Sequence, residues 1–432
     1  MRCILIVLDG LGDRGHRLLN GKTPLQAAST PNLDRIAEAG ISGLYHPLMQ
    51  GIALPSESAH FLMFGYNMAD MPGRGMLEAI GDGIPVNSED VAILARLFSA
   101  TLEGNKLIIQ NEKPDIDEES AYRLQQCIEP VVEGAFSLEL VPRKGIEGIL
   151  LLRGGLSTDI TDSNPVYAGR PIMKVRPLAP KENEPGAIIT ADLVNTFLRN
   201  SHLKLTGHPI NERRMAQGRL PVNALATQRA GGLTEAPSFE KRWGMKALSL
   251  SSGSVYRGIC SFLGIENRQI YGAADHEEDL LSKLKAAHLE TGFDFIHVHT
   301  KAPDEAAHTK NPEYKKEVIE ALDRALAFAI DEIIPNEDNL LVITADHSTP
   351  SSGRMIHSGE SVPLTMVGPN TRKDAVTAYD EVTCSCGGLG TARGRELMYL
   401  ILNFTDRGKL WGLIDSPDDE PYFPGHYESL EC

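Results

Sequence analysis

Short apolar runs alternate with amphipathic stretches over both ends of the chain. The runs ILIVL at 4–8 and LLVIT at 340–344 are typical of strands buried on both faces. The stretch 30–40 has Pro near its start and Gly at its end, as helices commonly do. Because parallel strands need a crossover, usually a helix, the alternation predicts an α/β core with a mostly parallel sheet flanked by helices. We predict further strands at 41–47, 293–300 and 363–368, and further helices at 277–292, 311–335 and 394–405.

The middle of the chain has a different pattern. Shorter strand-like pieces, such as those at 91–110 and 136–142, surround a helical stretch, and a long polar helical region follows at 188–218. This order favours a smaller α+β domain inserted between two halves of one core. We therefore predict a core made of 1–84 and 241–432, with an inserted cap domain at 85–240.

Three aspartates stand at or shortly after the ends of predicted strands. Asp9 follows ILIVL directly, Asp346 follows LLVITA, and Asp304 follows FIHVHTKAP. In open α/β sheets ligands bind outside the carboxyl ends of the strands, so these side chains should converge there. Converging carboxylates repel one another unless cations neutralise them. The pattern therefore indicates a metal site.

Histidines accompany these aspartates. His308 lies four residues after Asp304, His347 follows Asp346 directly, and His357 precedes another predicted strand. Mixed carboxylate and imidazole ligands suit Mn²⁺ or Zn²⁺, although Mg²⁺ and Co²⁺ also fit. Six such ligands are too many for one catalytic ion, and they favour two ions about 4 Å apart, as in phosphoryl-transfer sites. Other histidines, among them His60, His297 and His299, are given no role.

A nucleophile candidate lies in the segment ALPSESAH at 53–60. Ser56 and Ser58 stand where a helix begins, and the common role of a serine there is to cap the helix. The same place is suited to phosphate, because the helix N-terminus is positive. A serine hydroxyl bound to a metal could ionise near neutral pH and attack phosphorus. The residues alone do not separate the two serines.

The composition excludes several classes of protein. The net charge of −16 disfavours binding to nucleic acid, which needs basic surface. No apolar stretch approaches the length of roughly 20 residues that a membrane span requires. The first apolar run is too short for a signal peptide, so we expect a cytoplasmic protein. The cysteines form no CxxC pair and are expected to be reduced thiols: Cys3, Cys127, Cys260, Cys384, Cys386 and Cys432.

Several longer motifs carry a resemblance to a known family. They are VLDGLGDR, NGKTPLQAASTPNLDRIAEAG, HPINERR, PSFEKRWGMKA, TADHSTP, HSGESVP and GGLGTARGRELM, and they span nearly the whole chain. These motifs resemble those of the archaeal-type cofactor-independent phosphoglycerate mutases of the alkaline phosphatase superfamily. The resemblance implies a two-metal alkaline phosphatase-like core with an inserted cap.

The resemblance also implies an activity and a set of roles. A serine takes the phosphoryl group from one hydroxyl of phosphoglycerate and returns it to the other, and by motif this serine is Ser56. One metal would be held by Asp9, Ser56, Asp346 and His347, and the second by Asp304, His308 and His357. Three arginines stand near family positions that bind the small phosphorylated substrate: Arg74, Arg229 and Arg257.

Two segments of the expected cap depart from the family pattern. The stretch 107–116 lacks arginine where the family is rich in it, and Val166 in TDSNPV replaces a histidine. The cap selects the substrate, so a second hypothesis keeps the metal site and changes the acceptor. It is a phosphatase or a phosphotransferase acting on another small hydroxy acid or amino acid, such as a homoserine kinase-like relative. A third hypothesis is a regulatory or scaffold protein with a vestigial site. The sequence leaves the oligomeric state open.

Overall fold

The computed structural model describes residues 1–270 and 275–431, which form two compact units. The large unit contains 1–71 and 236–432, and the inserted unit contains 72–235. The five cysteines in the described ranges are free thiols, and Cys432 lies outside those ranges.

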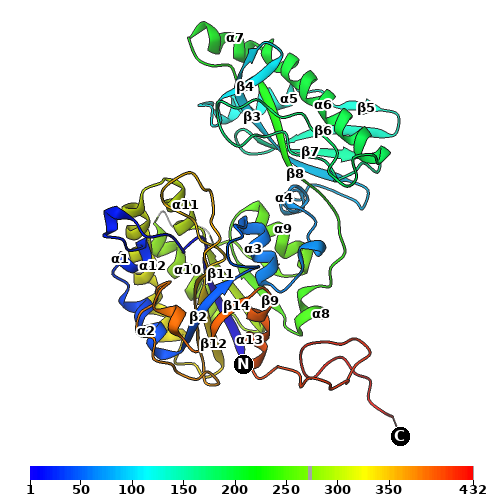
Figure 1. Cartoon of the computed structure of the whole chain (residues 1–432). Coiled ribbons are helices and arrows are strands. Elements are labelled where there is room, and N and C mark those ends of the chain that lie inside the picture. The colour runs from blue at the N-terminus through cyan, green and yellow to red at the C-terminus, as the bar shows by residue number, and fades with distance from the viewer. Residues whose placement is uncertain (271–274, 432) are drawn as a thin grey trace. The chain divides into compact units, whose positions relative to one another are not determined.

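An eight-stranded sheet forms the centre of the large unit (Figure 1). Its strands are β1 (Arg2–Leu8), β2 (Ile41–His46), β9 (Ala247–Leu250), β10 (Glu266–Asn267), β11 (Phe295–Thr300), β12 (Asn339–Thr344), β13 (Val362–Val367) and β14 (Gly390–Arg393). Their order across the sheet is β10-β9-β11-β1-β12-β13-β2-β14. Among the described strands of this eight-stranded sheet, only β13 runs antiparallel to its neighbours, β12 and β2. The predicted mostly parallel α/β sheet is therefore confirmed.

Helices cover both faces of this sheet (Figure 1). On one face α12 packs against both α2 and α10, and on the other face α3 packs against α9. The helices of the large unit are α1 (Pro24–Ala27), α2 (Pro31–Ala39), α3 (Ser56–Met63), α8 (Phe239–Trp243), α9 (Ser254–Leu263), α10 (His276–Leu289), α11 (Ala302–His308), α12 (Pro312–Phe328) and α13 (Glu396–Phe404). The two covered faces explain why β11, β12 and β13 are buried along their whole length.

The strands β11, β1 and β12 lie side by side and run parallel. Val7 of β1 pairs with His299 of β11 on one side and with Thr344 of β12 on the other. Because the three strands end at nearly the same level, the residues that follow them emerge at one edge of the sheet. This register positions the functional residues described below.

The inserted unit is built on an antiparallel sheet. Its strands are β3 (Val91–Glu103), β4 (Lys106–Asn111), β5 (Val131–Glu133), β6 (Phe136–Pro142), β7 (Glu147–Arg153) and β8 (Ala224–Gly232). They follow the order β4-β3-β7-β6-β5. The strand β8 lies outside this order and pairs antiparallel with β3 over residues 91–98. Its helices are α4 (Arg74–Gly81), α5 (Glu118–Gln126), α6 (Pro185–Thr206) and α7 (Pro209–Ala216).

Successive side chains of β3 point to opposite faces of this second sheet, and helices cover both faces. Ile93 and Leu97 belong to the core shared with α6, whereas Leu94 points to the opposite face and packs near Met76 of α4. The inserted unit therefore begins at Pro72 rather than at residue 85, since the apolar face of α4 is buried against this sheet.

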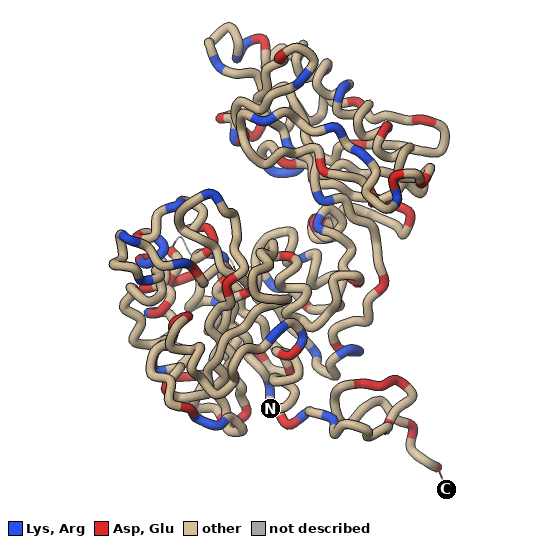
Figure 2. Tube along the Cα trace, viewed as in Figure 1, with Lys and Arg blue, Asp and Glu red and all other residues tan. Residues whose placement is uncertain are grey.

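The charged residues are spread along the chain. Acidic and basic residues are interspersed in both units (Figure 2). Within the described residues, no helix combines the length and the apolar character that crossing a bilayer requires.

Gly65 provides a test of the packing that holds α3 in place. Its φ of +80° is left-handed, and a Cβ placed there would come within 2.2 Å of the Trp243 ring. We expect Gly65→Ala to lower the free energy of unfolding of the large unit by about 2–4 kcal/mol, because backbone strain and overpacking add.

Gly21 is the matched control, since its φ is +83° and a Cβ there meets no atom within 4 Å. Gly21→Ala should cost only the backbone part, about 1 kcal/mol. Both tryptophans of the chain, Trp243 and Trp411, belong to the large unit, so urea unfolding followed by fluorescence reports on it. Equal losses in the two variants would contradict the packing argument.

Candidate functional site

Three buried aspartates meet at the edge of the sheet where β1, β11 and β12 end. Asp9 follows β1 directly, Asp346 lies two residues after β12, and Asp304 is in the first turn of α11, which follows β11. Their exposed fractions are 0%, 0% and 1%. The side chains come from distant parts of the sequence, and the parallel order of the three strands brings them together.

The first group of possible metal ligands is Asp9, Asp346 and His347. One ligand atom from each lies within 4.8 Å of the others. His347 Nε2 is 3.4 Å from Asp9 Oδ1 and 3.2 Å from Asp346 Oδ2. Those two carboxylate oxygens are buried and accept no hydrogen bond from the described residues. A cation between them would satisfy both oxygens, so the residues fit a metal ion.

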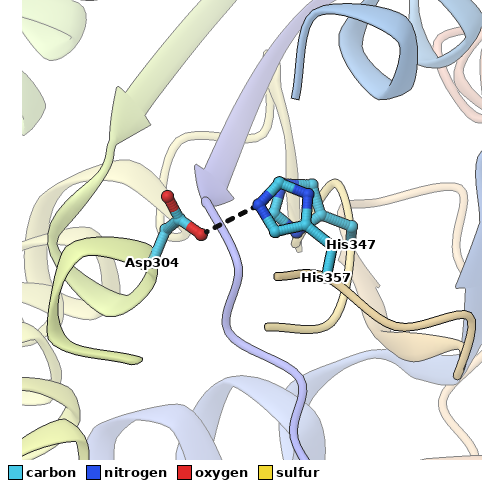
Figure 3. Close-up of side chains that lie close together, drawn as sticks. All are labelled: Asp304, His347 and His357. Carbon is cyan, nitrogen blue, oxygen red and sulfur yellow. Dashed lines mark ion pairs between the residues drawn. The ribbon is translucent and has the colours of Figure 1, made fainter. Parts of the chain in front are cut away.

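The second group is Asp304, His347 and His357, shown in Figure 3. His357 Nε2 lies 3.5 Å from Asp304 Oδ1, and the rings of His347 and His357 stack with their centres 3.9 Å apart. His308 Nε2 is 3.2 Å from Asp304 Oδ1, and its side chain is 38% exposed. His347 therefore stands in both geometric groups, whereas the sequence placed it in one ligand set. His308 lies beside the second group.

Hydrogen bonds fix the imidazole tautomers in the form that metal binding requires. His357 Nδ1 is 2.7 Å from the Leu54 carbonyl, which can only accept, so Nδ1 carries the proton and Nε2 keeps its lone pair. The Thr349 hydroxyl donates to Asp304 Oδ1 at 2.8 Å and accepts from His347 Nδ1 at 3.1 Å. His347 Nε2 is thereby also left with a free lone pair.

Of the two candidate serines, Ser56 lies beside these groups. It is the first residue of α3, and its Oγ is 3.0 Å from His347 Nε2. The Ser58 hydroxyl instead contacts the sulfur of Met71 at 3.8 Å. The capping role considered above does not apply to Ser56, because the N-cap residue of α3 is Pro55.

Burial and like charge dominate the electrostatics of the site. Burial, followed by the carboxylates of Asp346 and Asp304, raises the pKa of Asp9 well above its ordinary value. Burial also acts to raise the pKa of Asp346, but the imidazoles of His347 and His60 outweigh it and lower that pKa to about 2. Burial lowers the pKa of His347 to about 4, so this imidazole is neutral near pH 7.

Several groups that orient the carboxylates were missed by the sequence analysis. The Tyr256 hydroxyl donates to Asp9 Oδ2 at 2.6 Å, and His299 Nε2 lies 3.0 Å from the same oxygen. His60 Nδ1 also lies 3.3 Å from Asp346 Oδ2, but its hydrogen bond goes to the Ser56 carbonyl at 3.0 Å, so it holds the start of α3 beside that carboxylate. The spacing of Ser56 and His60, one helical turn apart, could have signalled His60. Nothing in the sequence indicated Tyr256, because no metal ligand was predicted in the segment around it.

The three predicted substrate-binding arginines are divided between the units. Arg257 belongs to α9 of the large unit, and its Nη2 donates to Ser254 Oγ at 3.0 Å. Arg74 and Arg229 belong to the inserted unit. Arg74 pairs with Glu78 at 2.6 Å, and Arg229 has a left-handed φ of 59°, which is uncommon for a residue with a side chain.

Comparisons with known proteins agree with this geometry. The chain matches the family model of the Metalloenzyme superfamily over residues 1–404. It is 42% identical over 432 residues to the 2,3-bisphosphoglycerate-independent phosphoglycerate mutase 2 of Methanocaldococcus jannaschii, covering 98% of each protein. It is 34% identical over 418 residues to the 2,3-bisphosphoglycerate-independent phosphoglycerate mutase of Methanopyrus kandleri, covering 95% of this chain and 98% of that relative.

Solved structures resemble the fold over most of its length. A Pyrococcus horikoshii protein superimposes with a TM-score of 0.75 at 30% identity, covering 95% of this chain and 99% of that one. The cofactor-independent phosphoglycerate mutase from Thermoplasma acidophilum gives 0.62 at 29% identity, covering 94% and 99%. The similarity thus extends through the inserted unit as well as the sheet that carries the aspartates. The chain belongs to the archaeal-type 2,3-bisphosphoglycerate-independent phosphoglycerate mutases of the metalloenzyme superfamily.

Proposed function

We propose that this chain interconverts 3-phosphoglycerate and 2-phosphoglycerate through a phosphoserine formed on Ser56. The observation that carries the proposal is the position of the Ser56 hydroxyl, 3.0 Å from His347 Nε2, in a site where Asp9 and Asp346 each keep an unbonded buried oxygen. Family membership supports the same substrate, because the related proteins are named for it.

The residues of the site divide between two divalent ions. Asp9, Ser56, Asp346 and His347 would hold one ion, and Asp304, His308 and His357 would hold the other. Bound ions would supply positive charge for the phosphoryl oxygens and would lower the pKa of the serine hydroxyl. Carboxylate and imidazole ligands together favour Mn²⁺ or Zn²⁺, and they also accept Mg²⁺ or Co²⁺.

The chain's own groups then carry the transfer in two steps. Ser56 gives up its hydroxyl proton and its Oγ forms a bond to phosphorus, while the bond between phosphorus and the first glycerate oxygen breaks and that oxygen takes up a proton to become a hydroxyl. The second glycerate hydroxyl then loses its proton and takes the phosphoryl group, and Ser56 Oγ regains a proton as its bond to phosphorus breaks. Ser56 stands at the N-terminus of α3, where the helix dipole favours an anion. Burial of the three carboxylates keeps this chemistry in a low-dielectric environment.

Arginines would hold the remaining anionic groups of the substrate. We assign this role to Arg257 in the large unit and to Arg74 and Arg229 in the inserted unit. The left-handed backbone of Arg229 supports its assignment, since strained residues concentrate at functional sites. The inserted unit would then act as the substrate-binding cap.

A second candidate function is a phosphatase or phosphotransferase that uses the same site on another small hydroxy acid or amino acid. One observation favours it. Val166, which replaces a family histidine, has a left-handed φ of 71°, a conformation that β-branched residues rarely adopt. Such a residue marks a segment of the inserted unit whose surroundings hold it in an unfavourable conformation.

An enolase-coupled assay separates these functions. Protein loaded with Mn²⁺ should convert 3-phosphoglycerate to 2-phosphoglycerate without net release of phosphate. Failure to form 2-phosphoglycerate, while a related mutase is active under the same conditions, would exclude the first function. Phosphate release or transfer in a screen of small phosphorylated metabolites would then favour the second.

The nucleophile is tested with two serines that are two residues apart. Ser56→Ala should lower mutase activity by at least about 1,000-fold, because the two-step route needs the hydroxyl. Ser58→Ala is the control and should keep most of the activity, since its hydroxyl contacts only Met71 among the hydrogen-bond partners described for it. Mass spectrometry of protein quenched during turnover should find the phosphate on Ser56. A phosphorylated Ser58 would refute the assignment.

The second ion is tested through Asp304. Asp304→Asn should bind about one Mn²⁺ per chain where the parent binds about two, and should lose most of its activity. Without metal, the variant should unfold at a lower temperature than the parent: burial acts to raise the pKa of Asp304, but its contacts with His308 and His357 outweigh burial and lower that pKa, so the folded chain stabilises the carboxylate that the substitution removes. Metal analysis and thermal unfolding check both statements. Asp331→Asn, which changes an exposed carboxylate, should alter neither.

A further inference from the structure

One buried lysine lies behind the metal-binding groups and belongs to none of them. Lys315 is in α12 and is 0% exposed. Its ammonium donates three hydrogen bonds, to the carbonyl of Gly12 at 3.0 Å, to Asp13 Oδ2 at 3.2 Å and to the carbonyl of Thr349 at 2.8 Å. An ammonium has three N–H donors, so all of them are used.

Asp13 extends these contacts. The backbone N–H of Ser351 donates to its Oδ2 at 3.0 Å, and the backbone N–H of Arg14 donates to its Oδ1 at 2.7 Å. His16 Nε2 lies 3.0 Å from the same Oδ1. The Lys315–Asp13 pair therefore joins two segments that are far apart in the sequence, 9–13 after β1 and 346–351 after β12.

These two segments carry the proposed metal ligands. Asp9 precedes Gly12 by three residues, and His347 precedes Thr349 by two. Thr349 holds the Lys315 ammonium with its carbonyl, while its hydroxyl donates to Asp304 and accepts from His347 Nδ1. Lys315 thus reaches two ligands, Asp304 and His347, through a single residue.

The same two segments approach each other closely. Gly10 has a φ of +65°, and a Cβ placed on it would meet the Thr349 hydroxyl at 2.6 Å and Asp304 Cβ at 2.8 Å. A small displacement of Thr349 would therefore open or crowd the space between the carboxylates. The contacts of Lys315 and Asp13 oppose such a displacement from the side that faces away from the ligands.

A buried ion pair is a poor means of stabilising a fold, because apolar residues of similar size often serve as well or better. We propose that Lys315, together with Asp13, is a positioning residue that fixes the distance between the segment bearing Asp9 and the segment bearing His347. Through Thr349 it also fixes the position of Asp304. This inference rests on the proposed two-metal site. A positioning role explains why a lysine whose ammonium uses all three donors occupies a buried position in α12 that an apolar side chain could fill.

The test compares variants of the whole chain, titrated with Mn²⁺ from the metal-free state and then assayed with Mn²⁺ bound. Lys315→Met removes the charge and keeps the length of the side chain, but it leaves Asp13 without its cation. The double variant Lys315→Met/Asp13→Asn removes both charges, so it should fold even where the single variant does not.

Two controls are available on the same helix. Lys316→Met removes an ion pair with Glu320, 2.7 Å away, in which both side chains are partly exposed. Asp323→Ala removes a buried carboxylate that accepts from the backbone N–H of Leu33 at 2.8 Å at the start of α2. The second control lowers stability without touching the segments that carry the ligands.

The readouts are Mn²⁺ affinity by calorimetric titration, the EPR spectrum of the coupled Mn²⁺ pair, and kcat and KM. For the more weakly bound of the two Mn²⁺ ions, we expect the Lys315 variants to raise the dissociation constant by about tenfold or more. We expect the kcat of these variants to fall by a similar factor. Their KM should stay close to the parent value, and the EPR signature of the coupled pair should change. Both controls should keep the parent's Mn²⁺ affinities, spectrum and kcat.

Each outcome has one meaning. Folded Lys315 variants with parental Mn²⁺ affinities and kcat would overturn the inference, as would the same losses in Asp323→Ala. A double variant that cannot fold would also overturn it, because the pair would then serve the fold and not the site. If the parent itself bound fewer than two Mn²⁺, the proposed two-metal site would fail, and that result is visible before any variant is measured.

Discussion

The repulsion among three buried carboxylates is the constraint on which the site depends. Asp9, Asp304 and Asp346 are each almost fully removed from water, and burial and mutual repulsion raise the pKa of Asp9. Such a cluster is tolerable only if positive charge lies among the oxygens. The parallel order of β11, β1 and β12 imposes the convergence, so the demand for cations follows from the topology of the sheet.

The protein meets this constraint by giving the two oxygens of a carboxylate different surroundings. Asp9 Oδ2 is held by Tyr256 and His299, while its Oδ1 accepts no hydrogen bond from the described residues. Asp346 Oδ1 accepts from the backbone N–H groups of Gly10 and His347, while its Oδ2 is likewise left over. One oxygen of each carboxylate thus fixes the orientation, and the other remains available to a cation.

The sequence predicted the parts of this arrangement that are local. Strand-terminal aspartates and the neighbouring histidines could be read directly, because a strand and the residue after it are contiguous. The sharing of His347 between two groups could not be read, since it depends on how two loops fold back on each other. Tyr256 and Lys315 come from α9 and α12, in which no metal ligand was predicted, and only the packing of those helices brings them to the site. The start of the inserted unit at Pro72 was missed for the same reason, because the burial of α4 is a tertiary contact.

The free energy that keeps the site assembled must come from elsewhere in the large unit. Burial and the neighbouring carboxylates make the ionised form of Asp9 costly without cations, whereas β11 and β12 are buried along their whole length and contribute the apolar burial that offsets this cost. Cations that bind the folded chain better than the unfolded one add stability in proportion to the logarithm of their concentration. The sheet must therefore hold the three aspartates together without an ion, and cations bound at the two candidate metal groups would add to that stability.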